Sequence, residues 1–484
     1  DGGVTLGTLF AIAGVHAPAP ATGGHRLPTC ARPLSDAGNA ERFVDRNREL
    51  VRYVHKLDRW LFHDGARFAL DDRREVYRLG IATARRIHAE AAAAETPDHA
   101  KAIAKHALQS EKRERIEAML GLARSLPPIA VLPEDLDLDP YALNLPNGVL
   151  DLRTGELAPH DRARLVTKLA PVAYDAQAKA PTWNAFLERI IPDPAVRAYL
   201  RRATGYSSTG SVSEQVLFFN YGTGANGKST FLETVRSALG EGEYAKAAAP
   251  DLLLAKRQDR HEAEVVDLRG ARFVTTVEVG EGRAWDEARV KWLTGADVLT
   301  GRPLYGHRFS FQPTHKFWIA GNHKLRVHGQ DLGFWRRLHF IPFTVTIPPE
   351  EQDHELLSRL RDELPGILRW IVQGCLEWHE KGLQPPEAVR AATQAYRSSE
   401  DVLASFLEER CIADAEKQVK LGPLYEEFRR WADRNGERGM SNRTFGDALE
   451  ERGFSRHRTG AGRWIQGLAL RVDDPAGAEA RDAA

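Results

Sequence analysis

The sequence predicts a multidomain α/β protein whose central part is a parallel sheet carrying a phosphate loop. Strand-like apolar runs at 215–222, 272–279 and 315–322 are separated by helical patterns, and such alternation favours a parallel sheet. A glycine-rich segment and a Lys-Ser-Thr triplet follow the first run, in "FFNYGTGANGKSTF" at 218–231. The region ahead of this sheet is mainly helical. Three helical patterns and a strand pair near the end predict a winged-helix-like C-terminal domain.

The composition is that of a soluble protein of two to four domains, since 484 residues exceed one ordinary core. Lysine plus arginine balance aspartate plus glutamate at 67 each, so nucleic acid would have to bind at a local basic surface or inside an assembled channel. No apolar run approaches the roughly 20 residues of a transmembrane helix. Cys30, Cys375 and Cys411 lie too far apart to indicate a disulfide framework or a zinc site, which favours a reducing cytoplasm.

Shifts in composition divide the chain into five predicted segments. Residues 1–38, rich in Gly, Ala and Pro, form a loosely ordered lead-in, and residues 39–125 form a helical N-terminal domain. Residues 126–185 form a proline-rich linker with a small β element. The α/β motor region spans 186–385, and the winged-helix-like domain spans 386–484.

The two segments ahead of the motor contain short-range signals of both helix and strand. Leu50, Val51 and Val54 continue a helical spacing of apolar residues, and two alanine-rich stretches favour helix by propensity. Two aromatic runs around residues 63–65 predict a hairpin within this helical region. In the linker, "GVLDLRTGEL" predicts two short strands joined at residues 154–155.

The strongest motif is the phosphate loop, because residues 222–229 match G-x-x-x-x-G-K-[ST] in full between an apolar run and a helical pattern. Glycines let the backbone turn tightly and bring N–H groups toward phosphate oxygens. Lys228 would reach the β- and γ-phosphates of ATP, the Ser229 hydroxyl would ligate Mg²⁺, and the dipole of the following helix favours the same anion. A chance glycine loop is the weaker alternative. The predicted ATP-binding residues are Gly222, Thr223, Gly224, Ala225, Asn226, Gly227, Lys228, Ser229 and Thr230.

Two later strand ends supply the other polar groups that a nucleotide hydrolase needs. Glu278 follows an apolar, β-branched run and is the candidate that holds Mg²⁺ or positions the attacking water, with Glu281 three residues further on. The alternative for both is a solvated loop carboxylate. Asn322 ends the next strand-like run, where its carboxamide would orient water or sense the γ-phosphate, although an asparagine after glycine is also a common turn residue.

Three segments, "GTGANGKST", "RFVTTVEVGEGRAWDEARVKWLTGADVLTGRPLYGHRFSFQPTHKFWIAGNH" and "GFWRRLHFIPF", appear in this order in the chain. In order and wording they resemble the phage and plasmid primase–helicase family, which includes poxvirus-type primase–helicases and whose motors belong to helicase superfamily 3. "LSDAGNAERFV", "WLFHDGARF" and "LNLPNGVLDLRTGEL" are similar to the family's region ahead of its motor. The resemblance covers most of the chain.

The resemblance implies an AAA+-like ATPase that assembles into a ring, usually a hexamer, and translocates on single-stranded DNA, typically 3′ to 5′. It implies that residues 222–230 carry ATP, Glu278 is the acidic motif and Asn322 is the polar sensor. Superfamily 3 motors often show two adjacent acids, whereas Val279 follows Glu278 here, so a shared role for Glu281 stays open. For a phage- or plasmid-encoded protein the compartment would be the bacterial host cytoplasm.

The interval between acid and sensor contains the predicted DNA contacts. "RPLYGHRFSF" predicts a hairpin, and in superfamily 3 motors a hairpin in this interval projects into the channel. Cations at its tip would pair with phosphates and an aromatic ring would stack on a base, which makes Arg302, Tyr305, His307 and Arg308 the candidates. An exposed hairpin with ordinary charges is the alternative. Lys291 fits a solvated helix face better than a ligand contact.

Further cations follow the sensor. Arg336 or Arg337 is the candidate for a finger that reaches the γ-phosphate held by a neighbouring subunit, and a structural arginine is the alternative. The C-terminal domain has a basic cluster that a winged helix would place on duplex or origin DNA, or that is simply a solvated face. Its members are Arg452, Arg456, His457, Arg458 and Arg463.

The leading hypothesis is therefore a replicative DNA helicase motor. A nucleotide-switched loader or origin-binding module and a P-loop small-molecule kinase are the alternatives. A primase needs clustered carboxylates that hold two metals. The acidic run at 134–140 has the residue types but lies in the linker, and residues 1–125 are too short and too helical for a primase domain. Primase activity would have to come from further sequence or from a partner.

Overall fold

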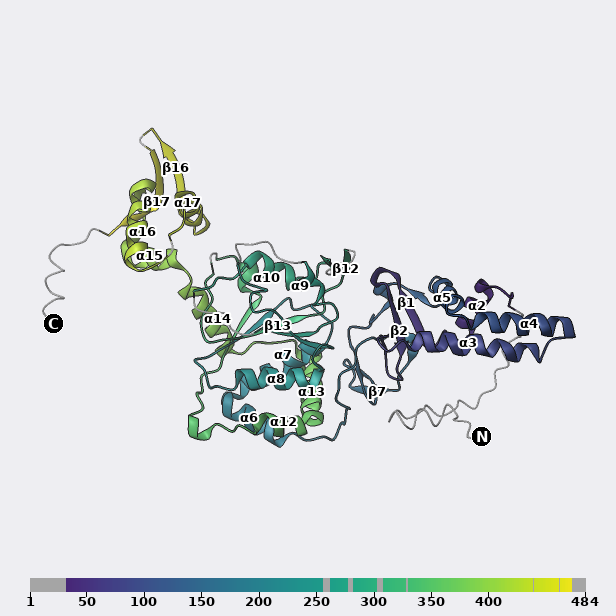
Figure 1. The fold of residues 1–484 in the computed structure, drawn as a ribbon. Coiled ribbons are helices and arrows are strands. Elements are labelled where there is room, and N and C mark those ends of the chain that lie inside the picture. Colours follow the sequence, from purple (N-terminus) through teal and green to yellow (C-terminus); the bar gives the residue numbers. More distant parts are fainter. Residues whose placement is uncertain are drawn as a thin grey trace.

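The computed structural model describes residues 32–255, 262–276, 282–302, 308–327, 330–437, 439–460 and 462–471. Figure 1 shows three parts in a row: an N-terminal part, a central part built on the largest sheet, and a C-terminal part at the other end. Within the described ranges, every helix is too short or too polar to cross a membrane. Glu278, Glu281, Tyr305 and His307 lie outside the described residues.

The N-terminal part combines four helices with a four-stranded sheet of order β3-β2-β1-β4. The hairpin predicted around residues 63–65 is confirmed, because β2 and β3 pair antiparallel. The helical interpretation of Val51 and Val54 is wrong: both lie in β1, whose residues are all buried and which pairs with β2 on one side and β4 on the other. The elements are α2 (Asp36–Asn47), β1 (Val51–Val54), β2 (Arg59–His63), β3 (Phe68–Leu70), α3 (Glu75–Ala91), α4 (Pro97–Ser110), α5 (Arg113–Ala123) and β4 (Ala130–Val131).

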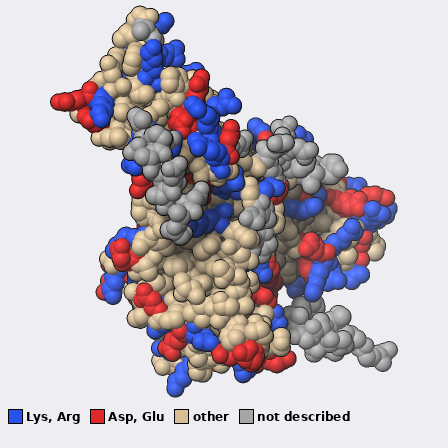
Figure 2. Space-filling view, turned by 90° about the vertical axis from the view of Figure 1, so that its left-hand side faces the viewer, with Lys and Arg blue, Asp and Glu red and all other residues tan. Residues whose placement is uncertain are grey.

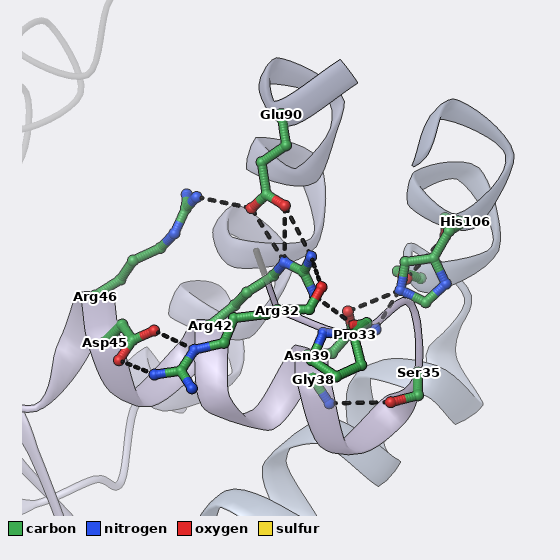
Figure 3. A network of polar contacts seen from close by, with 11 residues as sticks. Arg32, Pro33, Ser35, Gly38, Asn39, Arg42, Asp45, Arg46, Glu90 and His106 are labelled. Carbon is green, nitrogen blue, oxygen red and sulfur yellow. Dashed lines mark hydrogen bonds and ion pairs between the residues drawn. The ribbon is translucent and has the colours of Figure 1, made fainter. Parts of the chain in front are cut away.

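A polar network around Arg42 joins the start of the described chain to these helices, as Figure 3 shows. Arg42 is 4% exposed, and its guanidinium donates to both Glu90 carboxylate oxygens at 2.8–3.0 Å and to the carbonyls of Arg32 and Pro33 at 2.8 Å. A buried charge is stable only when paired and hydrogen-bonded, and these contacts meet that condition. The network therefore locks α2 onto α3.

The linker forms a three-stranded antiparallel sheet of β5 (Ala142–Leu145), β6 (Gly148–Asp151) and β7 (Glu156–Ala158), which confirms the predicted strand pair around residues 154–155. Acidic residues of the run at 134–140 bind partners elsewhere in the protein. Glu134 binds Lys56, Asp137 accepts from the backbone of Thr167 at 2.7 Å, and Asp139 binds Arg153. No group of three potential metal ligands exists among the described residues.

The central sheet is parallel throughout, with the order β14-β8-β13-β10-β9. Its alternate side chains enter two separate cores, one shared with α6, α7, α8 and α13 and the other with α9, α10, α11 and α14. A sheet buried on both faces explains the near-continuous apolar runs of its strands. The strands are β8 (Leu217–Tyr221), β9 (Ala245–Ala247), β10 (Phe273–Thr276), β13 (Lys316–Gly321) and β14 (Leu338–Pro342).

Helices lie on both faces of this sheet, so the central part has three layers (Figure 1). A separate antiparallel pair, β11 (Leu299–Gly301) and β12 (Phe309–Phe311), lies outside the sheet beside α9. The helices are α6 (Pro181–Ile190), α7 (Pro194–Ser208), α8 (Lys228–Leu239), α9 (Ala263–Val266), α10 (Glu287–Leu293), α11 (Leu332–Trp335), α12 (Leu356–Asp362), α13 (Leu364–Lys381) and α14 (Glu387–Ser399).

The C-terminal part has its own apolar core under a three-stranded sheet of order β15-β17-β16. The three helices and the final hairpin agree with the pattern in the sequence, while β15 is an additional strand. The elements are α15 (Val402–Arg410), β15 (Cys411–Lys420), α16 (Leu421–Arg434), α17 (Asn442–Glu451), β16 (Ser455–Thr459) and β17 (Gly462–Leu470). The winged-helix interpretation of this arrangement stays a prediction.

Charges of both signs are interspersed over the face drawn in Figure 2, and the middle of the central part shows a broad area without charged side chains. No single basic field covers this face, which agrees with the balanced composition of the chain. Any binding of a polyanion must therefore depend on particular side chains rather than on overall charge.

Candidate nucleotide site and nucleic-acid contacts

The loop at 222–227 connects the carboxyl end of β8 to the first residue of α8. Its shape requires glycine at two positions. A Cβ on Gly222 would lie 2.3 Å from the carbonyl oxygen of Phe343, and one on Gly227 would lie 2.6 Å from Ile190 Cγ2. Gly227 also has φ of +79°, a conformation that side chains disfavour. The loop is thus held tightly against its neighbours, with the N-terminus of α8 directly behind it.

Lys228 lies at the centre of the site and is only 5% exposed. Its Nζ donates to the Gly222 carbonyl at 2.8 Å, to Asn226 Oδ1 at 2.9 Å and to Asn322 Oδ1 at 3.0 Å. Asn322 is 94 residues away in sequence, so the fold brings together the loop lysine and the residue predicted to act as sensor. Charge-assisted hydrogen bonds of this kind hold the ammonium group in one place.

Strand order explains this contact. β13 pairs with β8 on one side and with β10 on the other, and all three run in the same direction. Their carboxyl ends therefore meet at one edge of the sheet, where open α/β folds bind ligands. Asn322 follows β13 at that edge, and Thr276 ends β10 there. The two candidate acids follow Thr276 in the sequence and lie outside the described residues.

One polar residue of β8 escaped the sequence analysis. Asn220 is fully buried, and neither its amide nitrogen nor its amide oxygen has a hydrogen-bond partner among the described residues. A buried amide without a hydrogen-bond partner lowers the stability of the fold, so its presence in the core needs an explanation. Asn220 lies two residues before the loop, and β13 and β14 flank it through Ala320 and Ile341. The signal in the sequence was a single carboxamide within the apolar run before the loop.

The two arginines of the finger prediction lie at the opposite edge of the sheet, because β14 begins directly after them. Since β8 runs parallel to β14 for five residues, that edge is about 17 Å from the loop. Arg336 is exposed, and one of its nitrogens lies 3.1 Å from Gln215 Oε1. Arg337 is 8% exposed and binds Gln215 as well; burial lowers its pKa from the ordinary value. The structure thus distinguishes the exposed Arg336 from the buried Arg337, which the sequence did not.

The predicted hairpin between acid and sensor is present as β11 and β12, with Gly301 opposite Phe309. Of the residues proposed to contact DNA, Arg302 and Arg308 are described and flank the undescribed tip. Arg308 forms an ion pair with Glu262. Lys291 pairs with Asp331, which agrees with its interpretation as an ordinary surface charge.

Three comparisons with known proteins bear on these observations. A family model described as D5 N terminal like matches residues 40–192, and one described as a family of unknown function, DUF5906, matches residues 220–337. A putative helicase, L207/L206, of Acanthamoeba polyphaga mimivirus is 28% identical over 329 residues, which are 62% of this chain and 34% of that protein. Together, the matched family model and the viral relatives support a primase–helicase family for this chain.

More distant viral proteins agree with this assignment. Putative helicase 022R of Frog virus 3 is 24% identical over 289 residues, 55% of this chain and 29% of that protein. Putative primase C962R of African swine fever virus is 23% identical over 329 residues, 62% of this chain and 34% of that protein. The chain spans about a third of the length of these curated relatives. The solved apo structure of the NrS-1 C terminal region (305–718) aligns over 90% of this chain and 99% of that chain, with 9% identity and a TM-score of 0.48.

Proposed function

We propose that this chain is the motor of an ATP-dependent replicative DNA helicase, which works as a ring and moves 3′ to 5′ along single-stranded DNA. The observation that carries the proposal is the triple contact of Lys228 Nζ with Gly222, Asn226 and Asn322 at the carboxyl edge of a parallel sheet. Relatives named as helicases and primases support a role in DNA replication.

The residues at this edge fit a nucleoside triphosphate. Close packing around Gly222 and Gly227 keeps the loop narrow, and a side chain at either position would collide with its neighbours. Lys228 supplies a buried cation directly at the N-terminus of α8, whose dipole favours phosphate. Bound ATP would supply the γ-phosphoryl group that is transferred to water. Asn226 and Asn322 hold the ammonium beside the loop, where the phosphates would lie.

A divalent ion also fits the site. Ser229 is exposed on the first turn of α8, next to the buried lysine, so its hydroxyl is available to Mg²⁺. Glu278 follows β10, two strands from the loop, and would hold the ion or the attacking water, with Glu281 as a second carboxylate. Bound Mg²⁺ would neutralise charge on the phosphates. Asn322, which lies between these elements, would orient the water.

The position of the arginines supports the proposed ring. Arg336 lies at the sheet edge opposite its own loop, so it cannot reach the nucleotide of its own subunit. An exposed arginine in that place suits a finger that acts on the neighbouring subunit, whereas the buried Arg337 fixes the start of β14. In a hexamer with ATP at the interfaces, the loop edge of one subunit would face the Arg336 edge of the next, so both edges of the sheet would contribute to each site.

DNA would be held by the β11–β12 hairpin. Arg302 and Arg308 flank its tip, which carries Tyr305 and His307 in the sequence. The cations would contact phosphates and the tyrosine ring would stack on a base. Because Arg308 pairs with Glu262, a phosphate would have to replace that carboxylate.

ATP hydrolysis with and without single-stranded DNA tests the proposal, with wild type and Lys228→Ala in parallel at low and moderate salt. The proposal expects hydrolysis that DNA stimulates, that the substitution abolishes, and whose stimulation falls as salt weakens phosphate contacts. Lysine-dependent hydrolysis that is indifferent to DNA would favour a nucleotide-switched loader or origin-binding protein. Phosphoryl transfer to a small molecule would indicate a kinase.

A further inference from the structure

The three-stranded sheet of the C-terminal part has an outer face that its helices do not cover. Its apolar core lies on the other face, where Ile465 and Leu468 of β17 are buried. Because side chains alternate along a strand, Trp464 points to the outer face. The register places Lys420 of β15 on one side of Trp464 and His457 of β16 on the other. Lys420, Trp464 and His457 therefore form one row across the three strands, with the indole between a cation and an imidazole.

This row is accessible to solvent, and contacts within the sheet hold its indole ring in place. Lys420 and His457 are exposed, and Trp464 is half-buried. The Lys420 ammonium lies 5.4 Å from the centre of the Trp464 ring, and the indole Nε1 donates to Thr459 Oγ1 at 3.1 Å. The indole is therefore held by its edge, and the Lys420 ammonium lies over one face of its ring. Proteins that bind single-stranded nucleic acids use an aromatic face next to a cation, because a base stacks on the ring and the cation contacts a phosphate.

The tip of the hairpin adds positive charge. Arg458 of β16 and Arg463 of β17 are exposed and directly opposite each other. Like charges in that register disfavour the pair. Neither arginine forms an ion pair with any residue in the described part of the chain, so a phosphate would relieve their repulsion. In Figure 1 this hairpin points away from the central part.

The helix expected to enter a DNA groove is less suited to the task. The exposed side chains of α17 include Glu450 and Glu451, and Asp447 is half-buried beside them. Arg456 folds back onto this helix and binds Asp447 at 3.1 Å and Glu450 at 2.7 Å, while Arg452 pairs with Asp401. Two of the five basic residues predicted to contact duplex DNA are therefore engaged within the protein.

We propose that the outer face of the β15–β17–β16 sheet, not helix α17, is a binding site for single-stranded nucleic acid. A base stacks on Trp464 in place of Lys420, whose ammonium then pairs with the adjacent phosphate. Because side chains alternate along each strand, Arg458 and Arg463 project from the opposite face at the turn end of the hairpin, where they would hold the backbone as the nucleic acid passes around the tip. The site is separate from the motor and does not depend on ATP hydrolysis.

Fluorescence anisotropy of the full chain without nucleotide, using a labelled oligo-dT of about 15 nucleotides, tests this site. Trp464→Ala is expected to weaken binding about tenfold, whereas Trp464→Phe retains most of the affinity. Two matched controls, Arg443→Ala on α17 and Arg430→Ala on α16, remove exposed arginines away from the sheet face and leave the affinity unchanged.

The salt dependence of binding and the rate of ATP hydrolysis distinguish a loss of this site from a loss of the motor. Arg458→Ala with Arg463→Ala reduces the slope of log affinity against log salt by about 1.4, since two phosphate contacts are lost. ATP hydrolysis without DNA remains at the wild-type rate in Trp464→Ala, which shows that the motor is intact. A preference for duplex that Arg443→Ala abolishes would overturn the proposal, as would unchanged binding by Trp464→Ala. Failure of ATP hydrolysis in the wild type would refute the motor proposal alone.

Discussion

Replacing Asn322 by alanine tests whether the contact between β13 and the loop lysine has a catalytic role. Among the described residues, the substitution removes the acceptor of Lys228 Nζ at 3.0 Å and leaves those at 2.8 and 2.9 Å. A hydrogen bond to a charged group contributes about 1.5–3 kcal/mol. Since each 1.36 kcal/mol changes a rate about tenfold, the turnover of ATP is expected to fall about 10- to 100-fold.

Nucleotide affinity is expected to change much less, because the loop and the contacts of Lys228 with Gly222 and Asn226 are retained. Single-turnover hydrolysis at saturating ATP measures the first quantity, and titration with a fluorescent nucleotide measures the second. Asn184→Ala on the exposed face of α6 removes a carboxamide elsewhere and serves as the control. Asn322→Asp keeps an acceptor but loses the amide donor. Wild-type turnover in Asn322→Ala would refute the assignment of Asn322 as sensor.

Four further outcomes are expected. Gly222→Ala abolishes nucleotide binding because its Cβ would lie 2.2 Å from the side-chain nitrogen of Asn226 and 2.3 Å from the carbonyl oxygen of Phe343, whereas Gly121→Ala, with open space around its Cβ, leaves binding unchanged in the same titration. Asn220→Leu removes an unpaired buried amide and raises the urea midpoint, the unpaired group costing about 1–3 kcal/mol, while a lower midpoint would show a hidden partner. Burial lowers the pKa of His315 to about 4 from an unfolded value near 6.5, so its contribution to stability is complete above pH 6.5, is lost as pH falls toward 4 and amounts to at most about 3 kcal/mol. Urea midpoints between pH 4 and 7 should thus show a shallower pH slope in His315→Gln, and equal slopes would contradict this. Arg336→Ala mixed with Lys228→Ala restores hydrolysis that neither variant has alone, and no restoration would remove the finger assignment.

Local motifs were predictable because their geometry depends on neighbouring residues. The phosphate loop and the β11–β12 hairpin both arise from glycines and apolar runs within about 10 residues. Strand β1 was not predictable in this way. Its residues Val51–Val54 continue the spacing of α2, and pairing with β2 on one side and with β4, near residue 130, on the other makes them a strand. Tertiary pairing overrode local periodicity there.

The same limit applied to β15 and to the arginine pair. Strand β15 is mostly exposed and lacks apolar alternation, so its identity comes from pairing with β17 about 50 residues later. Arg336 and Arg337 are adjacent, and only the tertiary structure decides which one is buried. The sequence predicted Asn322 as a sensor at a strand end, but its contact with Lys228 depends on the pairing of β13 with β8, which brings the carboxyl ends of these parallel neighbours together.

Strand displacement on tailed duplexes is the most direct test of the helicase proposal. Wild type with ATP and Mg²⁺ is predicted to release the labelled strand from a duplex with a 3′ single-stranded tail and not from one with a 5′ tail. Lys228→Ala is predicted to release neither, since its loop lacks the buried cation. Hydrolysis of ATP by the wild type without displacement of either substrate would contradict the assignment of this chain as a translocating motor.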